Sequence, residues 1–309
     1  MKATYKLSLF FFLSLIICFS CSESESDNTE PKEMPREEQP TEAKTENSLL
    51  WRISGKGLEK PSYLFGTIHL ICQKDFFMPE AAEEMLKETE RIAFELDMDD
   101  PAVLMGMAGK MNMRNDTVLS DLLEAEDLEI LSTWFKDSIG VDLASVAGQK
   151  PFVLTSMMYP KMMQCKSLTS FEGTFMDMAR EQEKEIIGLE TVEYQMGIFD
   201  SIPYSVQAEE LVKMVERWDS TVIELAELVE SYKSQDISSA AESFKESSAG
   251  MEEFEEVLLQ NRNKLWISRI DSITHEQPTF IAVGAGHLGG EEGVINLLKA
   301  EGFTLEPIK

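Results

Sequence analysis

The chain has 309 residues, of which 28 are basic and 56 are acidic, so its formal net charge is −28. Nucleic acids and anionic membrane surfaces repel such a charge, and the composition therefore argues against a nucleic-acid-binding protein. Hydrophobic residues make up 43% of the chain, which is enough for the core of one large domain or two small ones.

The first 20 residues have the composition of an export signal. Two lysines precede an apolar run at residues 7–19, and this run is shorter than the roughly 20 residues that a membrane-spanning helix needs. Residues 17–21 resemble a bacterial lipobox, with the small Ser20 before Cys21. We expect a lipid on Cys21 to anchor the protein to a bacterial membrane in the cell envelope, facing the periplasm or the surface. An ordinary signal peptide cut nearby is the alternative.

Residues 21–48 are predicted to be a disordered acidic tether. After its cysteine, this segment contains one Met and no other large apolar residue, and it is rich in Glu, Ser, Pro and Thr. Such a composition cannot bury enough apolar surface to offset the entropy of an ordered chain. The folded domain is therefore expected to span residues 49–309.

The domain is expected to open with a hairpin of strands at Leu50–Ile53 and Ser62–Phe65. A helix over Pro79–Glu90 and a strand over Arg91–Met98 follow. Glu95 falls inside the predicted strand at Arg91–Met98, and a carboxylate within a strand is unfavourable unless it has a partner. We therefore expect Glu95 to be paired.

Most of the chain between residues 101 and 272 is predicted to be helical, with a short strand at Glu185–Glu190. The helical region before this strand is rich in methionine, which indicates either a gap-filling core or an adaptable groove for apolar peptides.

A further helix is expected at about residues 251–270. Its apolar stripe is predicted to contain Phe254, Val257, Leu258 and Leu265. Asn261 and Arg262 lie in or beside that stripe, which indicates either a buried polar partner or an arginine that extends to solvent.

Two of the three histidines share a local pattern. Gly66 stands three residues before His69, and Gly284 stands three residues before His287, each after an apolar strand. An apolar strand at Phe280–Val283, a glycine-rich turn and an amphipathic helix form half of an α/β unit. Ligands bind such sheets at the carboxyl ends of their strands.

Two imidazoles and the Glu95 carboxylate would form a set of ligands suited to a divalent metal with an open position for water. Such a site supports hydrolysis near neutral pH. Histidines that only form hydrogen bonds at loop ends are the alternative. Residues 284–289 also fit the dinucleotide pattern G-x-G-x-x-G, with Glu306 about 20 residues further on, but this reading leaves His69 unexplained.

Cys72 and Cys165 remain in the exported domain. An oxidising compartment favours a disulfide between them, and two free thiols are the alternative. The third histidine, His275, has no second histidine at the spacing of a zinc-protease motif and is expected at the surface.

Several blocks of the sequence resemble those of a known family. The chain resembles the TraB/GumN family, which is similar to the Tiki metalloproteases of animals, over residues 49–309. The blocks that carry the resemblance are LLWRISGKGLEKPSYLFGTIHL, FELDM, FEGTFMDMAR, GLETVEYQ, RNKLW and VGAGHLGGEEGVINLLKAEGF.

The resemblance implies roles for particular positions. The two G-x-x-H motifs of the family correspond to His69 and His287, and the glutamate between them corresponds to Glu95. An Arg-Asn pair in the penultimate helix corresponds to Arg262 and Asn263, and a further glutamate corresponds to Glu190. The implied activity is metal-dependent proteolysis with Mn²⁺ or Co²⁺, and Zn²⁺ is also compatible with these ligands.

Taken together, the sequence predicts an α/β (α+β mixed) domain with a central mixed sheet, G-x-x-H loops at strand ends and a large helical insertion. We expect His69 and His287 to bind a metal, and Glu95 to bind it or to act as a general base. Arg262 would stabilise an oxyanion or hold a substrate carboxylate. The predicted function is a metal-dependent peptidase acting on a peptide or protein. The alternative is a lipid-anchored protein that binds a peptide or small ligand in the same cleft without catalysis.

Overall fold

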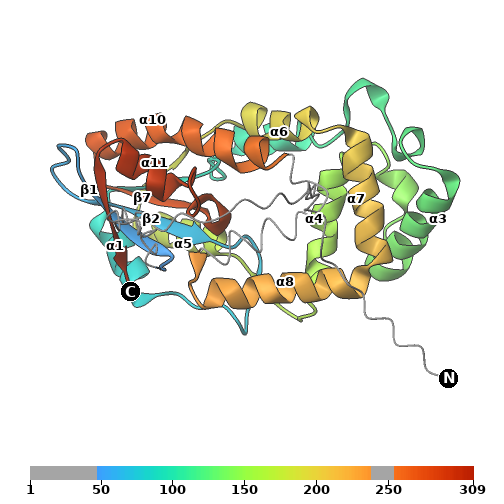
Figure 1. Cartoon of the computed structure of the whole chain (residues 1–309), viewed down its shortest axis with the longest axis horizontal. Helices are drawn as coiled ribbons and strands as arrows, with labels where there is room; N and C mark the ends of the chain where they lie inside the picture. The colour runs from blue at the N-terminus through green and yellow to red at the C-terminus, as the bar shows by residue number, and fades with distance from the viewer. Residues whose placement is uncertain (1–46, 238–253) are drawn as a thin grey trace, which may run out of the picture. The chain divides into compact units, whose positions relative to one another are not determined.

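The computed structural model describes residues 47–237 and 254–309 (Figure 1). The predicted signal segment, Cys21 and nearly all of the predicted tether lie outside these residues, as does the start of the helix predicted at residues 251–270. Among the described residues, no helix has the length and apolar character needed to span a membrane.

A mixed sheet of six strands forms the centre of the domain, in the order β6-β4-β7-β2-β1-β8. Neighbours among β6, β4, β7 and β2 are parallel, whereas β1 is antiparallel to both β2 and β8. The strands are β1 (Leu50–Gly55), β2 (Ser62–Thr67), β4 (Arg91–Phe94), β6 (Glu185–Gly188), β7 (Thr279–Gly284) and β8 (Phe303–Ile308). A separate antiparallel pair is formed by β3 (Ile71–Cys72) and β5 (Leu168–Thr169). The mixed α/β architecture predicted from the sequence is confirmed.

Most of the remaining described residues are helical. The longer helices are α1 (Glu80–Glu88), α2 (Pro101–Gly109), α3 (Ala125–Trp134), α4 (Pro151–Met162), α5 (Phe171–Glu181), α6 (Val192–Ser201), α7 (Tyr204–Glu216), α8 (Trp218–Lys233), α10 (Asn261–Glu276) and α11 (Val294–Ala300). Single turns and short irregular helices are η1 (Arg114–Asp116), η2 (Leu119–Asp121), η3 (Phe135–Ile139), η4 (Leu143–Ser145), η6 (Glu256–Gln260) and η7 (Ala285–His287).

The sheet lies between two helical layers. Helices α10 and α11 lie on one side of the strands, and α1 and α5 lie on the other (Figure 1). The helices lie on two sides because crossovers between parallel strands are right-handed. The connections from β2 to β4 and from β4 to β6 lead toward the β6 edge of the sheet, whereas those from β6 to β7 and from β7 to β8 lead toward the β8 edge. Every residue of β2 is buried, as expected for a strand covered on both faces.

A second, smaller core joins the helices far from the sheet. Leu131, Phe135, Leu154, Met158 and Leu211 are all buried there, on α3, η3, α4 and α7. The predicted amphipathic pattern of this region is thus accounted for by packing between helices. Not every methionine of this helical region fills a gap in the core, since Met105 on α2 is 78% exposed.

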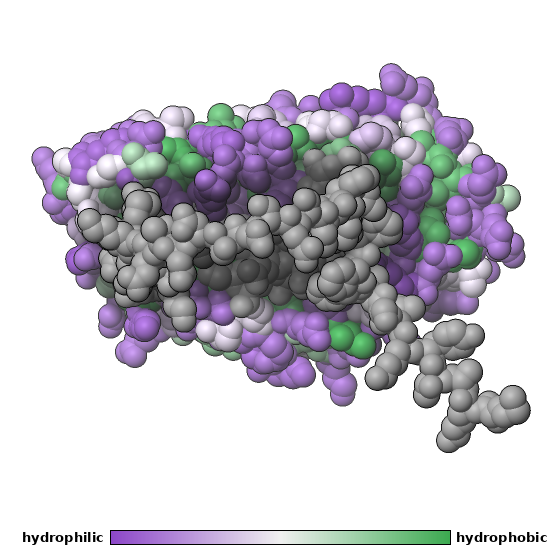
Figure 2. Space-filling view, viewed as in Figure 1, coloured by the Kyte–Doolittle hydropathy of each residue, from purple (hydrophilic) through white to green (hydrophobic). Residues whose placement is uncertain are grey.

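The surface agrees with the composition. On the face shown in Figure 2, hydrophilic residues cover most of the coloured surface and hydrophobic residues form small separate patches.

The structure corrects several details of the sequence analysis. The strand predicted over Arg91–Met98 ends at Phe94, so Glu95 follows the strand and does not lie within it. The C-terminal strand β8 was not predicted, although Phe303 and Leu305 are buried and Thr304 and Glu306 are exposed in the alternation typical of a strand at the edge of a sheet. These two corrections have one cause, since short edges and ends of strands depend on pairing partners that are distant in sequence.

The third correction concerns the helix that carries Arg262. The predicted apolar stripe included Leu265, which is 44% exposed in α10. The buried face instead contains Arg262, Asn263 and Trp266, together with the apolar Ile270. Polar side chains occupy an inward face here because partners across the interface satisfy them, and a hydrophobic pattern cannot reveal that.

A disulfide and a hydrogen bond join segments of the domain that are distant in sequence. Cys72 and Cys165 form a disulfide, which joins β3 to the segment after α4 across a sequence separation of 93 residues. Ser48, which the sequence analysis assigns to the tether, is buried, and its Oγ donates a hydrogen bond of 2.5 Å to the carbonyl oxygen of Ile308. The ordered part of the chain therefore includes Ser48.

Candidate functional site

The carboxyl ends of the four parallel strands lie side by side at one edge of the sheet. In the register of the sheet, Thr67 at the end of β2 pairs with Gly284 at the end of β7, and Phe94 at the end of β4 pairs with Ala282. Residues that follow these strands are therefore brought together although they are far apart in sequence. The predicted residues that follow them are His69, Glu95, Glu190 and His287.

Glu95 is held at the centre of this edge. The backbone N–H of Gly284 donates a hydrogen bond of 3.0 Å to its Oε1, and Arg262 donates one of 2.5 Å to its Oε2. Burial alone would raise the pKa of Glu95, but the charge of Arg262, with smaller contributions from His287 and His69, lowers it well below its usual range. Glu95 is thus an anion at neutral pH.

Arg262 on α10 joins two carboxylates. Its Nη2 lies 2.6 Å from Oε1 of Glu190, and its Nε contacts both oxygens of the same carboxylate at 3.1 and 3.2 Å. The side chain of Glu190 has no solvent exposure, and Trp266 donates a further hydrogen bond of 3.1 Å to it. Burial lowers the pKa of Arg262 but Glu95 and Glu190 raise it by more, so the guanidinium remains charged.

The tautomer of His287 follows from its partners. Asn263 donates through Nδ2 to the carbonyl oxygen of Glu292 at 2.9 Å, so its Oδ1 is the atom that accepts from Nδ1 of His287 at 2.6 Å. Arg262 lies 3.0 Å from Nε2 through Nη1, and an arginine can only donate. Nδ1 therefore carries the proton, and Nε2 presents its lone pair. Burial lowers the pKa of His287 to about 3, which keeps the ring neutral.

His69 has a different environment. Its side chain is 72% exposed, on the loop after β2, and its Nδ1 lies 2.9 Å from Oε1 of Glu172. The hydrogen bond to this carboxylate raises the pKa of His69 to about 9. Glu172, near the start of α5, also accepts a hydrogen bond of 2.6 Å from the hydroxyl of Thr67.

The three predicted metal ligands surround Gly284. A methyl carbon built on this glycine would lie 3.4 Å from Oε1 of Glu95 and 3.6 Å from Cδ2 of His287. It would also lie 4.0 Å from Nε2 of His69. The backbone angles of Gly284, φ −52° and ψ 135°, suit any residue. The absence of a side chain at this position therefore leaves space among the three donors.

The spacing of these groups is looser than that of a formed metal centre. Within residues 47–237 and 254–309, no three His, Cys, Asp or Glu side chains are grouped closely enough to hold a metal ion. Nε2 of His287 lies 3.8 Å from Oε1 of Glu95, and the guanidinium of Arg262 contacts both residues. The structure thus brings the predicted donors to one place, with a side-chain cation between two of them.

The structure adds residues that the sequence analysis did not single out. Glu172 contacts His69, and Gln195 donates to Glu95 at 3.3 Å and to Glu190 at 3.0 Å. Both stand in blocks that carried the family resemblance, FEGTFMDMAR and GLETVEYQ. Their presence in those blocks was the available signal, since neither has a local pattern of its own.

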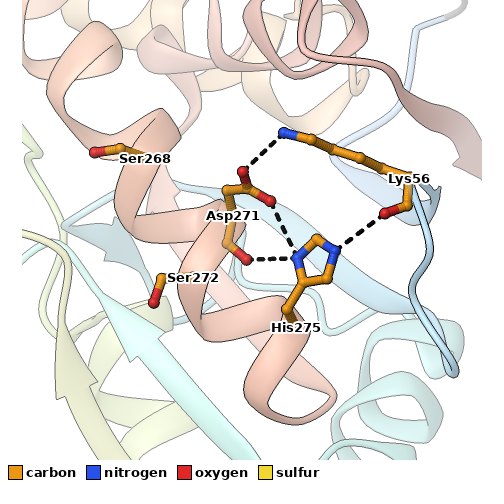
Figure 3. Close-up of a pocket in the computed structure, with 5 residues that line it drawn as sticks. All are labelled: Lys56, Ser268, Asp271, Ser272 and His275. Atoms are coloured by element: carbon orange, nitrogen blue, oxygen red, sulfur yellow. Dashed lines mark hydrogen bonds and ion pairs between the residues drawn. The ribbon is translucent and has the colours of Figure 1, made fainter.

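His275 is exposed, as expected, but it lies in the last turn of α10 and not in a loop. Figure 3 shows it in an open surface pocket with Lys56, Asp271, Ser268 and Ser272. Nδ1 of His275 contacts the carbonyl oxygen of Asp271, and Nε2 lies 3.0 Å from the carbonyl oxygen of Lys56. The side chain of Lys56 forms an ion pair with that of Asp271. These groups satisfy one another and link the β1–β2 turn to α10.

The arrangement at the sheet edge has clear chemical capacities. It holds an anionic carboxylate, a neutral imidazole with a fixed lone pair, a second imidazole paired with a carboxylate, and a guanidinium. These groups can bind a cation, move a proton, or stabilise negative charge on a substrate oxygen.

The chain is similar in sequence to a known family and to several curated proteins. The TraB/PrgY/gumN family matches over residues 49–307. Metalloprotease TIKI2 of Danio rerio is 22% identical over 87% of this chain and 62% of its own length, and human metalloprotease TIKI1 is 25% identical over 84% and 62%. The chain thus spans about three fifths of the length of these curated relatives. No solved structure matches the chain significantly.

The family match includes all the residues that meet at the sheet edge, from His69 to His287. It extends over nearly the whole described part of the chain, including the sheet and both helical layers. The chain belongs to the TraB/PrgY/gumN family.

Proposed function

We propose that the chain is a metal-dependent hydrolase that cleaves peptide bonds in a peptide or protein. The observation that carries this proposal is the meeting of His69, His287 and Glu95 around Gly284, at the carboxyl ends of adjacent parallel strands. Relatives named metalloproteases, at 22–25% identity, give it further support.

The residues fit a divalent ion by the chemistry of their donor atoms. Two imidazoles and a carboxylate suit Mn²⁺, Co²⁺ or Zn²⁺, provided that the ring of His69, whose pKa is raised to about 9, gives up the proton on Nε2 when the ion binds. Each imidazole is held by a hydrogen bond at Nδ1, as is usual for metal-ligating histidines. The contact between Arg262 and Nε2 of His287 would have to open for that nitrogen to bind an ion. When bound, a divalent ion would supply a Lewis acid for the substrate carbonyl and a more acidic water.

The side chains of this chain have separate tasks in the proposed reaction. Glu95 can bind the ion or accept a proton from the attacking water, since it is anionic and close to both histidines. Arg262 keeps its position through Glu190, so its Nη atoms can donate to developing negative charge or to a substrate carboxylate. Asn263 fixes the tautomer of His287.

A non-catalytic binding protein is the second candidate. It is favoured by the position of Arg262, whose guanidinium contacts Glu95 and His287 where a metal would be expected to bind them. In that case Arg262 would hold the carboxylate of a peptide or small ligand in the same cleft. Measurements of hydrolysis and of metal content separate the two candidates.

The proposed activity is tested with a single histidine. His287→Ala is expected to abolish hydrolysis of a peptide library in the presence of Mn²⁺ or Co²⁺, by at least a thousandfold, while leaving the circular dichroism spectrum unchanged. His275→Ala is the matched control, because this histidine lies in the separate surface pocket of Figure 3. Equal hydrolysis by wild type and His287→Ala would contradict the proposed activity, and unfolding of the variant would assign His287 a structural role.

We also propose that the protein is exported and attached to a membrane of the cell envelope through a lipid on Cys21. The support is the lipobox-like segment at residues 17–21 and the acidic stretch after it. Cys21→Ser is expected to move the protein from the membrane fraction to the soluble fraction of the cells that express it. Retention of this variant in the membrane fraction would contradict lipid attachment.

A further inference from the structure

His69 is the less constrained of the two histidines at the site. It follows β2 by two residues, and its ring is largely exposed to solvent, whereas His287 is buried against Trp266 with ring centroids 4.5 Å apart. An exposed imidazole on a loop rotates freely unless a hydrogen bond holds it. The ring of His69 therefore needs a fixed partner if Nε2 is to face Gly284.

Glu172 is itself held firmly. It stands in the first turn of α5, where the N-terminus of a helix favours a carboxylate, and only 26% of its side chain is exposed. Oε1 accepts hydrogen bonds from Thr67 and from His69. Oε2 is buried and accepts no hydrogen bond from the described residues. Oε1 of Glu172 thus faces His69, while Oε2 has no hydrogen-bond partner among the described residues.

The geometry of this contact selects one form of the neutral ring. A carboxylate only accepts, so the nitrogen that faces it, Nδ1 of His69, must carry a proton. In the neutral ring Nε2 then has the lone pair, and it is the nitrogen that lies 4.0 Å from the methyl position of Gly284. The same logic applies at His287, where Asn263 accepts from Nδ1.

We propose that Glu172 is the positioning residue of His69. Through Oε1 it fixes the proton on Nδ1 and the orientation of the ring, so that Nε2 faces the space shared with Glu95 and His287. Thr67 supports it by holding the same oxygen. Glu172 and Asn263 thus have parallel tasks, one from α5 on one side of the sheet and the other from α10 on the opposite side.

The consequence for metal binding rests on the proposed function, but the consequence for the proton does not. Partners that orient ligating histidines typically change metal affinity by 10- to 100-fold when they are removed. The tautomer of His69 is a property of the metal-free protein. The two readouts can therefore fail independently.

The experiment uses ¹⁵N-labelled histidine, which gives spectra of only three rings in this chain. Metal-free wild type, Glu172→Ala and Glu172→Gln are compared at a pH above the pKa of His69, where its ring is neutral. We expect the proton of His69 to be on Nδ1 in wild type, to move largely to Nε2 in Glu172→Ala, and to remain mainly on Nδ1 in Glu172→Gln, which keeps an acceptor oxygen. Thr67→Val is expected to give an intermediate shift.

Titration with Mn²⁺ provides the second readout. The dissociation constant is expected to rise about 10- to 100-fold in Glu172→Ala and to be unchanged in Glu181→Gln, an exposed acid on the same helix. An unchanged tautomer of His69 in Glu172→Ala would overturn the proposal, whether or not the wild type binds metal. If the tautomer of His69 shifts in Glu172→Ala and the wild type binds no metal, the positioning role is supported and the metal-dependent function is refuted.

Discussion

Replacement of Arg262 by alanine is expected to lower the free energy of unfolding by about 3–5 kcal/mol. The guanidinium is the cationic partner of Glu190, whose side chain has no exposure, and of Glu95, whose side chain is 13% exposed. Without Arg262, the carboxylate of Glu190 would keep, among the described residues, only the hydrogen bonds from Trp266 and Gln195. Removing one member of a buried ion pair costs most through the charge that is left behind. Urea unfolding followed by circular dichroism measures the effect.

Two variants define the origin of this loss. Arg269→Ala removes an exposed arginine from the same helix and is expected to change the free energy of unfolding by less than about 0.5 kcal/mol. Arg262→Ala combined with Glu190→Gln removes one of the two carboxylate charges left without their cation and is expected to recover part of the stability. A midpoint for Arg262→Ala equal to that of wild type would show that the ion pairs do not stabilise the domain.

Replacement of Gly284 by alanine is expected to leave the fold intact and to reduce both metal binding and hydrolysis at least tenfold. The backbone angles of Gly284 suit alanine, and the added methyl would meet its neighbours at 3.4–4.0 Å, which are ordinary contact distances. The methyl would, however, lie among the three donor side chains. Isothermal titration with Mn²⁺ and the urea midpoint measure the two effects separately.

The other motif glycine serves as the contrast. A methyl on Gly66 would lie 2.9 Å from Cδ2 of Leu288 and 3.1 Å from Cα of Ala285, so Gly66→Ala is expected to lower the free energy of unfolding by about 1–3 kcal/mol. The two glycines of the paired motifs thus have different tasks, since one permits close packing and the other leaves space at the site. Metal binding by Gly284→Ala equal to that of wild type would contradict this distinction.

The central part of the fold could be predicted because its signals are local. Apolar strands followed by G-x-x-H indicated where strands end, and parallel strands that end at one edge bring those residues together. The meeting of His69 with His287 follows from the pairing of β2 with β7. The family resemblance supplied Asn263 and Glu190, which have no local pattern. It also supplied the role of Arg262, whose position beside an apolar stripe indicated either a buried partner or an arginine that extends to solvent.

The remaining features depend on partners that the sequence does not place. The inward face of α10 was assigned to Leu265 because it is apolar, whereas the buried positions are Arg262 and Asn263, which Glu190 and His287 satisfy. Glu172 escaped notice for the same reason, because a glutamate in the first turn of a helix is ordinarily a helix-stabilising residue. Its contact with His69 appears only when α5 packs beside the end of β2.

The most direct test of the account is the metal content of the purified protein, measured by elemental analysis beside the double variant His69→Ala/His287→Ala. We expect about one Mn, Co, Zn or Fe per wild-type chain after loading, and its loss in the double variant, because both histidines lie with Glu95 around Gly284. No bound metal in the wild type after loading with each ion in turn would contradict the metal-dependent hydrolase and favour a protein that binds its ligand through Arg262.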